Sequence, residues 1–142
     1  MANAADYLTR TIPSGTWGNL QFEVFDLALA NGDAIASTHD LAIFGPGIEP
    51  IDACLWVTDL AAAASSTLDV GFKSVSGTNQ DDPLWAFQTA VITAVAFTRK
   101  TRTTAPFVMA QRMYLRATVR GAAQTDASAH KIGIFYRYRG NL

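Results

Sequence analysis

The sequence is poor in the residues that build most catalytic and metal sites. Its 142 residues include one cysteine, Cys54, and only two histidines, His39 and His130. A single cysteine cannot form an intrachain disulfide, and neither histidine has a second histidine or a cysteine at metal-ligand spacing. A phosphate-binding glycine loop and a Gly-x-Ser-x-Gly turn are also missing. We therefore expect no catalytic residues, no cofactor site and no metal ligands, and we predict that the protein is not an enzyme.

The chain also lacks the apolar segments that mark export or membrane insertion. It begins MANAADYLTRT, which has no basic stretch followed by a long apolar one, so we expect no signal peptide. No run of about 18 uncharged apolar residues is present, so we expect no membrane contact and synthesis in the cytoplasm. Charged residues make up only 16% and hydrophobic residues 49%, a balance that predicts one folded domain rather than disorder.

Acidic and basic residues are divided unevenly along the chain. Residues 1–98 hold eleven of the twelve acidic residues and two basic ones, whereas residues 99–142 hold nine basic residues and one acidic. The two parts could interleave in one fold and pair across strands, or they could form an acidic and a basic surface that docks other subunits. Nucleic-acid binding is not expected, because the basic part has no run of lysine and arginine and the net charge is −1.

Apolar residues alternate with polar ones over several segments, which is the pattern of half-buried β-strands. The clearest segments are 51–58, 67–73, 112–120 and 131–139, and weaker ones lie near 20–29, 41–44, 91–97 and 105–109. The positions predicted to form the core are Leu68, Val70, Phe72, Leu115, Val119, Ile132 and Ile134. Trp56 falls among the outward positions of its segment, which indicates that this face is covered as well. Residues 20–29 form a near-continuous apolar run, which suits a strand buried on both faces or held under a partner subunit.

Local patterns between the strands predict one helix and one hairpin. Asp82 is a good N-cap, Pro83 suits the first helical position and apolar residues follow at helical spacing, so we predict about two turns of helix over residues 82–90. The small-residue segment 121–129 predicts that the strands before and after it form a hairpin.

About eight short strands with turns between them predict the fold class. We expect an all-β protein, a jelly roll or antiparallel β-sandwich with at most one or two short helices. Regular crossover helices, which a parallel sheet would need, are missing. We assign residues 1–19 to an N-terminal arm or loop and residues 20–142 to a single domain.

Residues 67–142 follow a characteristic order of strands and turns. TLDVGF at 67–72 is followed by an acidic loop and a short helix around residues 81–88, then by YLRATVRGAA at 114–123 and a small-residue loop. The last strand, at 132–138, ends in Arg139-Gly140-Asn141. This order resembles the jelly-roll cement or decoration proteins of tailed-phage heads, in particular those of short-tailed phages that infect Bordetella. The resemblance implies a virion protein that binds the outer surface of the head shell and bridges neighbouring subunits of the major capsid protein, without catalytic residues.

The residues that would contact the shell are predicted from their charge and spacing. Arg112, Arg116 and Arg120 lie at even offsets on one strand and therefore share a face. A hairpin would bring Arg137 and Arg139 near them. We expect carboxylates of the capsid protein or of a sister subunit opposite these guanidinium groups. The predicted interface consists of Trp17, Phe25, Arg112, Arg116, Arg120, Arg137 and Arg139.

Two further predictions concern assembly and a competing function. We expect self-association, as a homodimer in preference to a trimer, because the apolar content exceeds what one small core requires and closed symmetry is the common outcome. The alternative function is another phage-type binding module, such as a tail, carbohydrate-binding or receptor-binding β-sandwich. Exposed tryptophans in a groove would favour sugar binding, whereas anchors spread over a flat surface favour a cement protein.

Overall fold

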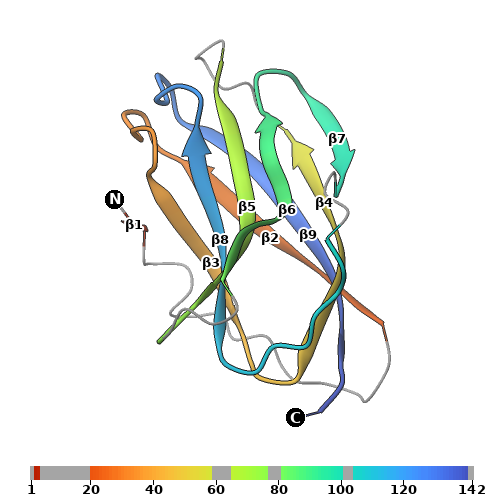
Figure 1. Cartoon of the computed structure of the whole chain (residues 1–142). Helices are drawn as coiled ribbons and strands as arrows, with labels where there is room; N and C mark the ends of the chain where they lie inside the picture. Colours follow the sequence, from red (N-terminus) through yellow and green to blue (C-terminus); the bar gives the residue numbers. More distant parts are fainter. Residues whose placement is uncertain (1, 4–19, 59–64, 77–80, 101–103, 141–142) are drawn as a thin grey trace.

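Two β-sheets packed face to face make up the structure (Figure 1). The computed structural model describes residues 2–3, 20–58, 65–76, 81–100 and 104–140, and this part of the chain contains no helix. The strands are β1 (Ala2–Asn3), β2 (Gln21–Leu29), β3 (Thr38–Phe44), β4 (Ile48–Val57), β5 (Thr67–Ser74), β6 (Asp82–Val91), β7 (Ala96–Arg99), β8 (Met113–Arg120) and β9 (Ser128–Tyr138).

The strands pair in a nested order. One sheet has the order β1-β3-β8-β5-β6 and the other the order β2-β9-β4-β7. β2 pairs with β9, β3 with β8, β4 with β7 and β5 with β6, all antiparallel, while the short β1 adds in parallel beside β3. Eight antiparallel strands wound in this way over two sheets form a jelly roll, so the predicted fold class is confirmed.

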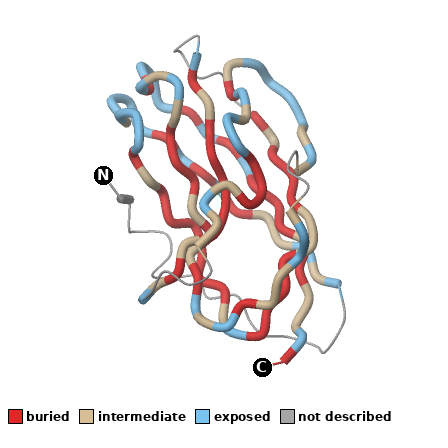
Figure 2. Tube along the Cα trace, viewed as in Figure 1, coloured by how far each residue is buried: buried red, intermediate tan, exposed pale blue. Residues whose placement is uncertain are grey.

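The core lies between the two sheets, where the strands in Figure 2 are coloured as buried. All seven predicted core residues are fully buried there. Phe44 lies at the centre of an aromatic cluster, with its ring edge-on to Phe25, Phe72 and Tyr136 at centroid distances of 5.5–5.9 Å. Aromatic pairs in this geometry add to the stability that burial alone provides.

The apolar run at the start of the domain is divided between the two faces of β2. Phe25, Leu27 and Leu29 point into the core, whereas Phe22 lies on the outer face and is 45% exposed. In β4, a bulge between Pro50 and Asp52 shifts the alternation by one residue. Such an extra residue is the usual means by which a strand changes the face that its side chains occupy.

The predicted helix over residues 82–90 is wrong, because these residues form β6. Trp85, Ala86 and Phe87 are all buried, and packing against the core therefore outweighs the local helix pattern. Pro83 is tolerated because β6 is the edge strand of its sheet, where a missing N–H costs no ladder bond on the free side.

The predicted hairpin between residues 112–120 and 131–139 is also wrong. β8 lies in the five-stranded sheet between β3 and β5, whereas β9 lies in the other sheet between β2 and β4. The small-residue segment between them therefore crosses from one sheet to the other. The predicted strand at 105–109 is irregular instead, and Met109 exchanges backbone hydrogen bonds with Gly47 and Ile48.

Candidate functional site

The outer face of the four-stranded sheet carries a cluster of aromatic side chains. Phe22 of β2, Phe135 of β9, Trp56 of β4 and Phe97 of β7 form what we call the aromatic face. Ring centroids are 4.4 Å apart for Phe22 and Phe135, 6.2 Å for Phe22 and Trp56, and 5.3 Å for Trp56 and Phe97. Phe22 and Phe97 are 45% and 55% exposed. A connected set of large apolar groups in contact with solvent is characteristic of a protein-binding surface.

Gly133 lets the aromatic face lie flat on the sheet. It is paired with Val24 on one side and Cys54 on the other. A Cβ atom at this position would lie 2.6 Å from the Cys54 Sγ atom and 2.6 Å from the Phe22 ring. Burial raises the pKa of the Cys54 thiol, so it stays protonated and serves as packing beneath the rings rather than as a nucleophile.

Ion pairs within the chain surround the aromatic face. Lys131 pairs with Asp26 and Arg99 pairs with Asp52. Glu49 accepts hydrogen bonds from both Arg137 and Arg139. These charges are compensated inside the molecule, so the surface offers an apolar centre with a polar rim, the composition of a typical protein–protein contact.

The outer face of the other sheet carries Arg116 and Arg120 of β8, and Arg112 directly precedes this strand; we call this surface the arginine face. Arg116 binds the nearly buried Asp40 with two hydrogen bonds, Nε to Oδ1 at 2.6 Å and Nη2 to Oδ2 at 2.8 Å. Hydrogen bonds to Asp40 raise the pKa of Arg116 above its usual value, against the opposing effect of burial. Arg120 donates from Nε to the buried Asp69 at 2.8 Å, and Arg112 is exposed.

The predicted interface residues therefore do not share one surface. Arg112, Arg116 and Arg120 lie on the arginine face, whereas Arg137 and Arg139 lie beside the aromatic face on the opposite side of the sandwich. The reason is the placement of β8 and β9 in different sheets.

The predicted interface includes two aromatic residues, Phe25 and Trp17, and the structure tests only the first. Phe25 is only 1% exposed and packs edge-on against Phe44 in the core, so it is not a surface anchor. Trp17 lies outside the described residues, as do most of residues 1–19. The predicted interface does not include Phe22, Phe97 or Phe135, although the outward position of Trp56 in the sequence pattern indicated that this face is covered.

The acidic and basic parts of the chain form ion pairs with each other in the fold. Asp40, Glu49 and Asp69 from the acidic part of the chain pair with arginines of the basic part. Cross-strand pairing, one of the two interpretations of the sequence, is thus confirmed for these residues.

Metal-binding and acid–base groups are sparse in the described part of the chain. No group of three or more His, Cys, Asp and Glu side chains there could hold a metal ion. His39 Nε2 lies 3.0 Å from Asp33 Oδ2, where the pair joins β3 to the turn before it. Nor do the described residues include a helix with the length and apolarity needed to cross a membrane.

Asp81 connects the end of β5 to the start of β6. Its carboxylate accepts hydrogen bonds from the Ser74 backbone N–H at 2.7 Å and from the Ser74 hydroxyl at 2.6 Å, and it pairs with Lys73. Burial raises the pKa of Asp81, but the hydrogen bonds from Lys73 and Ser74 together outweigh this effect, so the pKa lies below its ordinary value of 3.8.

We expect Asp81→Asn to remove an acid-sensitive part of the stability. Because the folded-state pKa is lowered, the carboxylate stabilises the fold above the unfolded-state pKa, and this contribution is lost as the pH falls through the folded-state pKa. The variant should be less stable than the wild type near neutral pH, and the difference should shrink at about pH 3. Urea unfolding at both pH values measures the difference in stability between the wild type and the variant. A difference that does not change with pH would contradict a lowered pKa of Asp81 in the folded state.

Comparison with known proteins places the fold among phage capsid chains. No protein-family model matches the sequence, and no curated protein matches it. A chain from the capsid of Ralstonia phage GP4 is 22% identical, with a TM-score of 0.73 over 100% of both chains. A chain from the cyanophage Pam1 capsid is 14% identical, with a TM-score of 0.65 over 97% of this chain and 99% of that one.

A third chain with the fold comes from the acidic stable capsid of Helicobacter pylori bacteriophage KHP30. It is 11% identical, with a TM-score of 0.57 over 86% of this chain and 95% of that one. Identities this low show similarity of fold alone. The alignments nevertheless span the neighbours almost completely, so this jelly roll is the fold of whole, similarly small chains from three phage capsids.

Proposed function

We propose that the protein is a structural capsid cement, or decoration, protein. It binds the outer surface of a phage head shell in the virion and bridges neighbouring subunits of the major capsid protein. The observation that carries this proposal is the match in fold, over 86–100% of this chain, to chains from three phage capsids. The sequence pattern of residues 67–142, which resembles cement proteins, also supports it, although the short helix of that pattern is the strand β6. Membership of a phage of Bordetella remains a prediction from that resemblance.

A bridging protein needs two contact surfaces, and the sandwich offers two. The aromatic face provides apolar anchors, and Arg137 and Arg139 lie on its rim. The arginine face provides Arg112 and Arg120, whose side chains extend partly into solvent and could bind carboxylates of a second subunit. Exposed ion pairs contribute only about 0–1 kcal/mol each, so the aromatic face supplies most of the affinity in this proposal.

The competing binding-module function receives less support from the tryptophans that the structure describes. A sugar-binding groove would need exposed tryptophans along it. Trp85 is buried in the core, and Trp56 is half-buried in a flat sheet face between two phenylalanines. Anchors spread over a flat surface favour a contact with another protein.

The proposal includes self-association, as a homodimer in preference to a trimer. Support comes from the exposed aromatic face and from the prevalence of twofold symmetry among homo-oligomers. Sedimentation of the purified chain over a range of concentrations measures this. A sedimentation coefficient that stays at the monomer value throughout would contradict it.

Binding of variants to shells that lack the protein tests the proposed function. We expect Phe22→Ser combined with Phe97→Ser to lower the affinity about 30-fold or more, the loss of at least one strong anchor. Arg112→Gln should weaken binding less and reduce its dependence on salt. Arg116 and Arg120 are left unchanged because they neutralise the buried carboxylates of Asp40 and Asp69.

Ile35→Ser is the matched control, since Ile35 is also an exposed apolar residue but lies in the turn between β2 and β3. It should bind as the wild type does, and thermal unfolding verifies that every variant is folded. Unchanged binding of the aromatic double variant would rule out the aromatic face as the anchor. A wild-type chain that does not bind shells would refute the cement function itself.

A further inference from the structure

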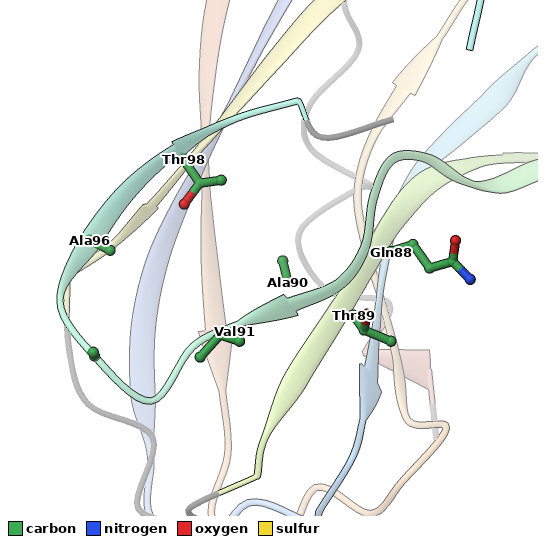
Figure 3. A pocket seen from close by; sticks show the side chains of 7 residues that line it. Gln88, Thr89, Ala90, Val91, Ala96 and Thr98 are labelled. Carbon is green, nitrogen blue, oxygen red and sulfur yellow. The ribbon is translucent and has the colours of Figure 1, made fainter. Parts of the chain in front are cut away.

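A groove opens along the side of the sandwich where both sheets end. β6 is the last strand of the five-stranded sheet and β7 the last strand of the four-stranded sheet. The space between them measures about 370 Å³ (Figure 3). Its lining residues are Gln88, Thr89, Ala90, Val91, Ala94, Ala96 and Thr98. None of these side chains is charged, and most are small.

A bulge in β6 shapes one wall of the groove. Val70 of β5 pairs with Phe87 and Leu68 pairs with Ala90, so β6 holds one extra residue at this point. Thr89 there has a φ of 51°, which is rare for a β-branched residue and costs energy. Asp69 Oδ1 accepts the Thr89 N–H at 2.8 Å, and Arg120 holds the other carboxylate oxygen. The wall is therefore fixed in its shape by a buried carboxylate.

Exposed apolar residues gather at the rim of the groove. Val91, which lines the groove, and Val95, in the connection between β6 and β7 that also supplies Ala94, are two of the six large apolar residues with high exposure in the described chain. Ala90 packs against the core, so the floor of the groove continues the packed interior. Apolar surface concentrated at an edge strand is a hazard for aggregation unless a partner covers it.

We propose that the groove receives an extended, uncharged segment of a neighbouring shell protein, which pairs with the free edge of β7 and inserts a bulky apolar side chain. This inference rests on the proposed function. β4 takes one edge of β7, and no other described strand pairs with the second edge. An incoming strand would bond to this edge through its backbone, as in other cases of β-strand addition.

The lining of the groove selects the chemistry of the occupant. A charged side chain placed there would lose its hydration without meeting an opposite charge. The groove is deep because three of its lining residues are small: Ala90, Ala96 and Thr98. A leucine, isoleucine or phenylalanine side chain of the partner would fill this space. β7 of a second copy is a poorer occupant, because its inward side chains, Ala96 and Thr98, are small and would leave a void between the sheets.

Filling the groove from within the chain tests this proposal. Ala96→Leu places a larger side chain where the partner would insert, and we expect shell binding to fall about tenfold or more, equivalent to one strong apolar contact. Ala34→Leu is the matched control, since Ala34 is an exposed alanine in the turn between β2 and β3. The control should bind as the wild type does, and thermal unfolding verifies that both variants are folded.

A photo-crosslinking residue in place of Thr98 identifies the occupant directly. We expect crosslinks on assembled shells to an extended, apolar segment of another shell protein. Crosslinks only between copies of this chain would overturn the proposal, as would wild-type shell binding by Ala96→Leu. Failure of the wild-type chain to bind shells is a separate result, since it would refute the cement function together with this inference.

Discussion

Replacing Phe72 with alanine should lower the free energy of unfolding by about 3–5 kcal/mol. Phe72 is fully buried at the inner face of β5, with ring centroids 5.5 Å from Phe44, 5.3 Å from Trp85 and 6.1 Å from Phe107. The substitution removes contacts with aromatic residues of β3, β6 and the segment before β8, and it leaves a cavity that close-packed neighbours fill only partly. Chemical denaturation of the wild type and the variant measures the difference.

Phe22→Ala is the matched control for this experiment. Phe22 is the same residue type in the neighbouring sheet, but it lies on the aromatic face and keeps much of its surface in water. Its loss should cost no more than about 1 kcal/mol, since surface substitutions remove little buried area. Equal losses for the two variants would mean that the inner and outer faces are wrongly assigned.

Replacing Arg116 with alanine should cost about 2–4 kcal/mol, somewhat below the loss that is typical of a fully buried pair. The Asp40 side chain is only 5% exposed and the Arg116 side chain 22%. Without the guanidinium group, the carboxylate of Asp40 would stay buried and lack its two charge-assisted hydrogen bonds. Urea unfolding measures the loss.

Two comparisons separate this effect from a general loss of surface charge. Arg99→Ala removes the partner of Asp52, but the Arg99 side chain is largely exposed, so the cost should be about 0–1 kcal/mol. Combining Arg116→Met with Asp40→Leu should recover most of the stability, because no unpaired charge remains buried. A double variant as unstable as Arg116→Ala would show that the lost hydrogen bonds themselves, rather than the stranded carboxylate, dominate.

The inward residues of the strands could be predicted because their spacing depends only on the local backbone. Leu68, Val70 and Phe72 alternate with polar residues, and period two is sufficient to assign them to one face. The run that contains Phe22 and Phe25 has apolar residues at both odd and even positions. The alternation of side chains along a strand therefore could not decide which of the two faces the core. The prediction of Phe25 as an interface residue is wrong, because this side chain is buried in the core.

The partners of each strand could not be predicted, since pairing depends on the whole chain. The connection between β8 and β9 is short and rich in small residues, which suits a hairpin and a crossing between sheets equally well. Asp82 and Pro83 fit a helix start, but the burial of Trp85 and Phe87 at a sheet edge outweighs that preference. The two faces of the candidate site depend on this pairing, and so the arginines were wrongly grouped on one surface.

The nested order of the strands determines when the sheets can form during synthesis of the chain. Gln21 pairs with Tyr136 and Leu29 with Ser128, so the partner of the first long strand is the last of the described strands in chain order. Topologies dominated by such distant pairings fold slowly, on a scale of about milliseconds to seconds. β9 also lies between β2 and β4, and until it emerges from the ribosome these strands have no common partner. A nascent chain would therefore expose Phe25 and Leu27 until β9 has been synthesised, and apolar surface exposed in this way is prone to aggregation.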